Sequence, residues 1–419
     1  MLTLVLKIAR SPALGSALTF ALGGAGFALG NILLAGVLPA EEYGAIALFL
    51  ALTQLGSEVG PLGLELVINR HRFAATRSLL GRAALTSVLA GIVFALYAIS
   101  VYGATASLSS VLAATVFFAS LNRVAGAFFQ SRRKFGLSLF LNLIHHWILV
   151  CAVPVVLLAQ RPDALPAALT TMAGYVLMAV VGWRKGLEES HSENALPAPS
   201  SRTLLLEGSA AMGAQLALSA LFQVDRLLIP RLLSIGELAN YSVVATLAGS
   251  PFRMLQIGLG YSLLPRLRAC RTHKEIQRLI GQEARVAIVI GLMAATAVFV
   301  VTPWILGELL DNRYSFTPAL LVAFVVVGFV RLWDGIARAV VTALGSARDL
   351  HVLNACGWAA LGIGILGAVL LAEAELTGIT YGVGAGWLAL ALASTMLGRR
   401  ARETHVSSST VSEPRTPDK

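Results

Sequence analysis

The residues of this sequence most suited to a functional role are charged side chains inside long apolar segments. The stretch 317–342 is otherwise apolar but contains Arg331, Asp334 and Arg338, which fall within one arc of a helix at 100° per residue. A charged side chain near the centre of a bilayer costs at least about 2.5–3.5 kcal/mol on insertion scales. Such residues are therefore expected to bind a ligand, to pair with one another or to face water.

Other apolar segments carry polar faces of the same kind. These faces hold Arg123 and Arg253, while Glu58 and Asp225 lie in two further segments. Polar faces on several helices must meet each other or water and not lipid, so the simplest arrangement is a water-filled central cavity. Because the arginines inside the segments outnumber the nearby acids, we expect this cavity to be net positive.

A purely structural interpretation stays open for several of these residues. Asp334 is spaced to neutralise Arg331 three positions before it and Arg338 four positions after it. Arg338 can also extend its head group to the membrane interface, and Glu58 can pair with an arginine.

The charged residues stand out because the rest of the chain is unusually apolar. Of the 419 residues, 57% are hydrophobic and 13% are charged, and the mean hydropathy is +0.77, whereas average protein composition includes about 25% charged residues. This composition excludes a disordered chain, a coiled coil and a disulfide scaffold, and it argues against a water-soluble enzyme. A polytopic membrane protein is the class that remains.

Twelve apolar segments are long enough to cross a bilayer, which takes about 20 residues of helix. In lipid the backbone must satisfy its own hydrogen bonds, so all twelve are expected to be helices. The first is too long for the apolar part of a signal peptide, and we expect it to be retained. The predicted spans are residues 12–38, 44–66, 81–102, 107–129, 136–159, 164–183, 205–231, 238–263, 285–307, 317–342, 351–371 and 376–397.

The net charge of +10 comes mainly from Lys and Arg residues in the loops between the spans. Their position indicates a role in membrane topology and not in nucleic-acid binding. With the N-terminus inside, 24 of the 32 Lys and Arg residues fall on the inner side and three on the outer side. This asymmetry follows the positive-inside rule and predicts that both termini are cytoplasmic.

A polar segment, residues 184–204, divides the spans six and six. Tyr43 and Tyr241 each open a span after a short acidic loop, which is a weak likeness between the halves. Because six is even, both halves enter the membrane in the same direction, as parallel repeats do. We expect an N-terminal six-helix bundle (1–183), a cytoplasmic linker (184–204), a C-terminal six-helix bundle (205–398) and a disordered cytoplasmic tail (399–419), with a basic membrane-surface helix at about 264–284.

Motifs for catalysis, metals and ATP are absent from the sequence. There is no GxxxxGK[ST], no HExxH and no Cys/His cluster, and the three cysteines are far apart. We therefore expect no catalytic residue, no metal and no cofactor. Energy would come from an ion gradient, the membrane potential or the substrate concentration.

Several segments resemble the polysaccharide flippases (Wzx-type, O-antigen) of the multidrug/oligosaccharidyl-lipid/polysaccharide exporter superfamily. The opening GNILLAGVLPAEEYGAIALFLALTQLGSEVGPLGLE resembles the first two helices of that family, and VDRLLIPRLLSIGELANYSVVATL resembles the seventh and eighth. The family typically has an Asp before the loop between the seventh and eighth helices and a Tyr after it, and Asp225 and Tyr241 resemble these two residues. ALGSARDLHVLNA and LTGITYGVGAG resemble its later helices. The segment RLWDGIAR is more charged than the family pattern requires.

The resemblance implies an all-α protein of about 12 membrane helices, in two six-helix bundles arranged as a V. It implies a flippase of a bacterial inner membrane that moves a polyprenyl-pyrophosphate-linked oligosaccharide to the periplasmic leaflet for surface polysaccharide, such as the O-antigen of lipopolysaccharide. The head-group contacts would be Arg123, Arg253 and Arg331, with Arg338 as a further candidate, because guanidinium groups suit phosphate geometry. Asp225, Asp334 or Glu58 would couple transport to H⁺ or Na⁺. The other partners would be the lipid bilayer and the polysaccharide polymerase machinery.

Rival functions remain at this stage. A drug or cation exporter of the same superfamily would need an acidic cavity, whereas the predicted cavity is rich in arginine. The lipid II flippases usually have fourteen helices, whereas twelve are predicted for this chain. A membrane-bound glycan polymerase or ligase generally needs a sizeable periplasmic loop, whereas the predicted outer loops are about ten residues or fewer.

Overall fold

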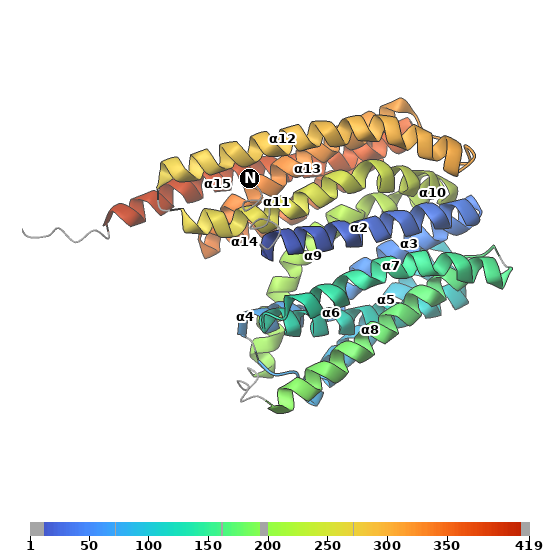
Figure 1. The fold of residues 1–419 in the computed structure, drawn as a ribbon, viewed down its shortest axis with the longest axis horizontal. Coiled ribbons are helices and arrows are strands. Elements are labelled where there is room, and N and C mark those ends of the chain that lie inside the picture. The colour runs from blue at the N-terminus through green and yellow to red at the C-terminus, as the bar shows by residue number, and fades with distance from the viewer. Residues whose placement is uncertain (1–11, 72, 161, 193–199, 271, 412–419) are drawn as a thin grey trace, which may run out of the picture. The chain divides into compact units, whose positions relative to one another are not determined.

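The computed structural model describes residues 12–71, 73–160, 162–192, 200–270 and 272–411, and every regular element in these ranges is helical (Figure 1). The helices of the first half are α2 (Pro12–Val37), α3 (Ala40–Val59), α4 (Leu64–His71), α5 (Arg77–Tyr102), α6 (Ala106–Ser131), α7 (Phe135–Ala159) and α8 (Leu165–Ser192). Those of the second half are α9 (Ser201–Leu232), α10 (Ile235–Val244), η1 (Ala245–Gly249), α11 (Ser250–Ala269), α12 (His273–Trp304), η2 (Ile305–Leu309), α13 (Pro318–Leu344), α14 (Ala347–Leu370), η3 (Ala372–Ala374) and α15 (Glu375–Val411).

Each predicted span coincides with a helix or with two helices separated by a break. Within the described ranges, nine helices are long and apolar enough to cross a membrane, and the bent pair α3–α4 makes up to ten. The described part of the first span contributes a shorter apolar helix, Gly23–Val37. The eighth span is divided into α10, the one-turn π-helix η1 and α11. The all-helical, multi-pass architecture is thus confirmed, while the count of twelve stays a prediction.

The described chain forms two compact units. The N-terminal unit comprises residues 19–246 and 309–315, and the C-terminal unit comprises residues 12–18, 247–308 and 316–411. The division between these compact units follows α10, because α9 packs on α3 and α4, and α10 packs on α3. The predicted linker at residues 184–204 stays a prediction. The division into two six-helix repeats stays a prediction.

Helix α6 is the centre of the N-terminal unit and packs against α3, α4, α5, α7 and α8. Buried aromatic side chains fill the space around it, among them Phe128 and Phe129. Trp183 of α8 donates a hydrogen bond from Nε1 to the Leu121 carbonyl at 2.9 Å, and the Asn122 side chain donates to the Leu141 carbonyl at 2.8 Å. These bonds satisfy polar groups that would otherwise be buried without partners and fix the rotation of α6.

Helix α13 has the same central place in the C-terminal unit. It packs against α11, α12 and α15, and α15 also runs alongside α14 (Figure 1). Phe252 and Leu332 belong to the buried cluster between α11, α12 and α13. The faces of α13 that the sequence predicts to be polar are therefore held against neighbouring helices.

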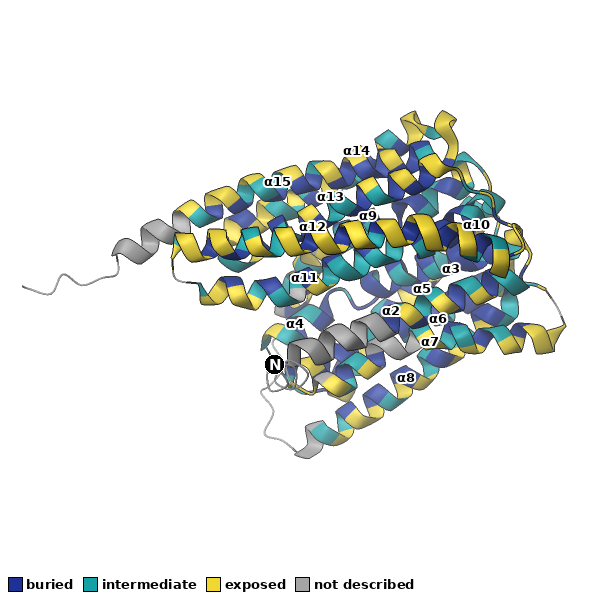
Figure 2. Cartoon of the chain, turned by 45° about the horizontal axis from the view of Figure 1, so that its top comes forward, coloured by how far each residue is buried: buried dark blue, intermediate teal, exposed yellow. Residues whose placement is uncertain are grey.

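Apolar side chains cover the outside of several helices, as expected for a surface in contact with lipid. Figure 2 shows that much of α12 is exposed, and its large exposed residues include Val286, Val289 and Val300. Exposed apolar faces of this extent are unusual on a soluble protein. They support a multi-pass membrane protein.

Three polar segments differ from their predicted structure. No separate surface helix forms at 264–284, because α11 continues to Ala269 and α12 begins at His273, where a reciprocal cap between Thr272 and Glu275 starts the helix. Helix α8 continues to Ser192, and residues 193–199 of the predicted linker lie outside the described residues. Helix α15 continues to Val411, so residues 399–411 of the predicted disordered tail are helical, whereas 412–419 lie outside the described residues.

Candidate functional site

A break between α3 and α4 positions two acidic side chains. Glu58 lies in the last turn of α3 and Glu65 in the first turn of α4, and the two helix axes differ in direction by 50°. The turn between them places Leu62 at φ 50° and Gly63 at φ 74°. Glycine adopts this left-handed conformation without the strain that a β-carbon introduces. The sequence Gly-Pro-Leu-Gly at 60–63 therefore ends α3 and lets α4 begin in a different direction.

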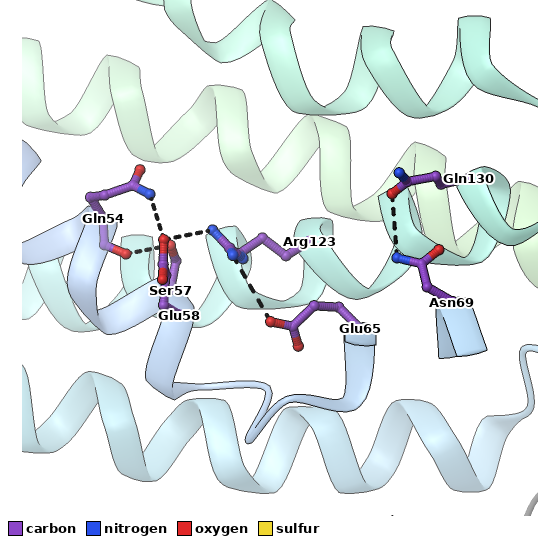
Figure 3. A network of polar contacts seen from close by, with 7 residues as sticks. All are labelled: Gln54, Ser57, Glu58, Glu65, Asn69, Arg123 and Gln130. Atoms are coloured by element: carbon purple, nitrogen blue, oxygen red, sulfur yellow. Dashed lines mark hydrogen bonds and ion pairs between the residues drawn. The ribbon is translucent and has the colours of Figure 1, made fainter. Parts of the chain in front are cut away.

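Arg123 of α6 lies between these two carboxylates (Figure 3). Its Nη1 is 3.3 Å from Oε1 of Glu58, and its Nη2 is 3.9 Å from Oε1 of Glu65. The Gln54 side chain donates a further hydrogen bond to Glu58 Oε1 at 3.0 Å. One guanidinium thus bridges both sides of the helix break.

The charges of this triad (Glu58, Glu65 and Arg123) are not balanced. Two carboxylates share one guanidinium, and the side chains of Glu58 and Glu65 are only 3% and 9% exposed. The second oxygen of each carboxylate, Oε2, is buried and has no hydrogen-bond partner. Arg123 is 24% exposed. The sequence predicts a positive site around Arg123, whereas the described groups at the triad carry formally one excess negative charge.

A second polar cluster of the N-terminal unit surrounds Asp225 of α9. The Tyr241 hydroxyl of α10 donates a hydrogen bond to Asp225 Oδ2, and the Arg226 backbone N–H donates to Oδ1 at 2.8 Å. The Arg226 guanidinium donates to Gln223 at 3.2 Å. Asp225 therefore links α9 to α10 through a buried hydrogen bond.

In the C-terminal unit, Asp334 forms a buried ion pair within α13. Its side chain is 0% exposed; it is paired with Arg338 and accepts a hydrogen bond from Ser394 of α15 at 3.1 Å. The spacing of four residues predicts this pair. Asp334 therefore has the structural role that the sequence leaves open, which is to neutralise Arg338 within α13.

The other two predicted arginines lie on the same packed helices. The Arg331 guanidinium carbon stands 4.9 Å from the ring centroid of the buried Trp387 of α15, within the range of a cation–π contact. Arg253 is half-buried on α11, which packs against α13. Gln256, one turn after Arg253, lies against Gly335. Three arginines and one buried aspartate therefore lie on the two packed helices α11 and α13.

An apolar cavity opens between α12, α13 and α15 of the C-terminal unit. Its volume is about 300 Å³, and its lining includes Phe329, Trp333, Ile336 and Val340, with Arg402 also present. Ser394, which donates to Asp334, lies in the same lining.

The structure brings some predicted site residues together and separates others. Arg123 joins Glu58, and Arg338 joins Asp334, whereas the first pair lies in the N-terminal unit and the second in the C-terminal unit. Glu65 is not among the site residues predicted from the sequence, although its spacing puts it on the same polar helical face as Glu58. The Arg331–Trp387 contact is not predicted either, because the sequence carries no local signal for it.

No group of three or more His, Cys, Asp or Glu residues suited to hold a metal ion is present in the described ranges. Roles for the predicted site residues in substrate binding and ion coupling stay predictions.

A family model identifies the family of this chain, and solved structures share its fold. The model of a family described as "Polysaccharide biosynthesis protein" matches residues 16–269. No curated protein matches the chain. An inward-facing multidrug-resistance transporter of the MATE family, in the MOP superfamily, is 13% identical with a TM-score of 0.68, covering 93% of this chain and 96% of that one. The lipid II flippase MurJ, in an inward closed conformation, is 11% identical with a TM-score of 0.65, covering 94% and 90%.

Proposed function

Because this chain belongs to the polysaccharide biosynthesis protein family, we propose that it is a flippase for a lipid-linked oligosaccharide. The substrate is a polyprenyl-pyrophosphate-linked glycan, carried from the cytoplasmic to the periplasmic leaflet by alternating access. Such a head group carries several negative charges and cannot cross hydrocarbon unaided. The reason is that moving an unpaired charge from water into hydrocarbon costs a large free energy. The protein must therefore replace the water that hydrates the pyrophosphate.

The observation that carries this proposal is the excess of arginine on the α11–α13 pair. Arg253, Arg331 and Arg338 are half-buried there, and Asp334 is the buried acid beside them. Two positive charges remain after Asp334 is counted, on planar groups that bind phosphate oxygens in pairs. A polar, positive surface in the middle of apolar helices is costly unless it meets an anion or water.

The apolar cavity between α12, α13 and α15 supports a lipid-linked substrate. It is lined mainly by hydrocarbon and aromatic side chains, which suit an isoprenoid chain, while the pyrophosphate contacts arginines. In this scheme the head group and the chain of one substrate are bound by different surfaces of the protein.

A cation exporter is the second candidate, and the triad at the α3–α4 break favours it. Two buried carboxylates around Arg123 are suited to a cationic ligand, and the fold is shared with a MATE multidrug transporter. This candidate predicts that deletion of the gene raises sensitivity to cationic drugs and leaves surface polysaccharide normal.

Alanine substitutions of the membrane arginines test the flippase proposal. Arg253→Ala and Arg331→Ala should abolish export of surface polysaccharide in a complementation assay while the protein accumulates in the membrane at its normal level. Arg399→Ala, which removes a charge from the cytoplasmic end of α15, is the matched control and should have little effect. Full export by both membrane variants contradicts a cationic head-group site.

A further inference from the structure

The triad at the α3–α4 break cannot hold all its charges at once without a further partner. Arg123 neutralises one carboxylate, and the remaining negative charge is left among Glu58, Glu65 and their buried Oε2 atoms. A buried carboxylate with an unsatisfied oxygen is unstable as an anion unless a counter-charge or a proton reaches it. A proton on one carboxyl group gives that group a donor and brings the formal charge of the triad to zero.

The neighbouring helices supply little further compensation. From α3 itself, Gln54 donates to Glu58 but carries no charge. Tyr175 of α8 interacts electrostatically with Arg123 and is a neutral phenol. On α9, Glu207 is engaged by His71 and Arg70 at the far end of α4.

Three further charged groups on the packed helices do not compensate the two carboxylates. Arg77 and Arg82 of α5 are exposed. Asp225 of α9 is bonded to Tyr241 of α10. Arg123 is therefore the cation that faces the two carboxylates in the described structure.

We propose that Glu58 and Glu65 form a proton-binding pair whose occupancy is linked, through Arg123, to the binding of an anion. When a phosphate-type anion takes the Arg123 guanidinium, the two carboxylates lose the counter-charge that they have among the described residues and bind an additional proton. When the anion leaves, Arg123 returns to the carboxylates and the proton is released. The anion's arrival at Arg123 rests on the proposed function, whereas the charge imbalance does not.

The geometry of Arg123 suits this exchange. Its contact with Glu65 is long, at 3.9 Å, and its side chain is partly exposed while both carboxylates are buried. The guanidinium can therefore reach a ligand on its open side while the acids stay in place. Because the two carboxylates lie on either side of the helix break, a change in their charge also acts on the α3–α4 bend.

Linkage fixes the sign of the effect. If anion binding brings one proton onto the pair, protons and anion promote each other's binding by the same factor. Anion affinity then rises as the pH falls, by up to about tenfold per pH unit over the range in which one proton is taken up. Neutral glutamine at both positions removes the sites where the proton binds and flattens this dependence, whereas a single glutamine leaves one carboxylate that still loses its counter-charge.

The test is proton uptake on anion binding by the full-length protein purified in lipid nanodiscs. Inorganic pyrophosphate is titrated by calorimetry in two buffers of different ionisation enthalpy, at several pH values, with wild type, the double variant Glu58→Gln/Glu65→Gln and the exposed control Glu41→Gln. Wild type and Glu41→Gln should take up close to one proton more per bound anion than the double variant. Pyrophosphate's own protonation is common to all three proteins, so the difference between them isolates the pair.

The outcomes of this titration separate the proton coupling from the flippase proposal. Pyrophosphate binding with the same proton uptake in wild type and in the double variant overturns the coupling and leaves the flippase proposal intact. If wild type does not bind pyrophosphate, Arg123 is not an anion contact and the coupling is wrong. The flippase proposal is then tested separately, by export of the lipid-linked substrate in cells. If the double variant fails to accumulate, wild type carries the test alone, and the absence of net proton uptake on pyrophosphate binding at every pH overturns the coupling.

Discussion

At Arg123, removal of the charge and removal of its partners should have opposite consequences. Arg123→Ala leaves two buried carboxylates without a cation, which should destabilise the protein by about 3–5 kcal/mol, because breaking a buried pair strands the remaining charge. Adding Glu58→Gln and Glu65→Gln to that variant should recover much of the loss. The measurement is the thermal unfolding midpoint in detergent, with membrane abundance as a second readout. A triple variant no more stable than Arg123→Ala contradicts the ion-pair account.

Some residue-scale contacts could be predicted from the sequence and others could not. The Asp334–Arg338 pair follows from spacing on one helix. Glu58 and Glu65 are seven residues apart, which separates them by about 10 Å along a straight helix, so one guanidinium between them is not expected without the bend. The Arg331–Trp387 contact joins α13 to α15 and depends on tertiary packing that no local pattern contains.

At the scale of elements, the α3–α4 break should depend on Gly63 far more than other turns depend on their glycines. A β-carbon at Gly63 would lie 2.0 Å from the Gly208 carbonyl oxygen of α9, in addition to the cost of its positive φ. Gly103, which ends α5, also has a positive φ but has open space around it.

Gly63→Ala should therefore lower the unfolding midpoint and the export activity substantially. Gly103→Ala should cost only about 1–2 kcal/mol, the penalty of a left-handed residue that has a β-carbon. Thermal unfolding of both variants in the same detergent compares them directly. Equal losses would show that the backbone conformation alone, and not the close approach of α4 to α9, sets the requirement for glycine.

Helix positions were the most predictable elements, because an apolar run of span length has few alternatives to a helix in lipid. The interruptions were less predictable. Gly60-Pro61 marks a possible break at α3–α4, but the π-helix at Ala245–Gly249 has no comparable signal. The continuous helix α12 was also missed, because the polar start of this helix at His273 resembles a surface segment.

At the scale of the whole molecule, the distribution of positive charge predicts the orientation. A fluorescent protein fused after residue 419 should be fluorescent, since it stays in the cytoplasm, and alkaline phosphatase fused after residue 103 should be active, since that loop is outside. The reciprocal fusions should be inactive and serve as controls. Active phosphatase at residue 419 would contradict the cytoplasmic C-terminus.

Movement of a lipid-linked oligosaccharide across the membrane can be followed in cells. The most direct measurement is the leaflet distribution of the lipid-linked repeat unit in membranes from cells that lack the gene, with and without a plasmid copy. The flippase account predicts that the completed repeat accumulates in the cytoplasmic leaflet, that surface polysaccharide is lost, and that the plasmid restores both. Normal surface polysaccharide with an unchanged leaflet distribution would contradict it, and a simultaneous gain in sensitivity to cationic drugs would favour the exporter.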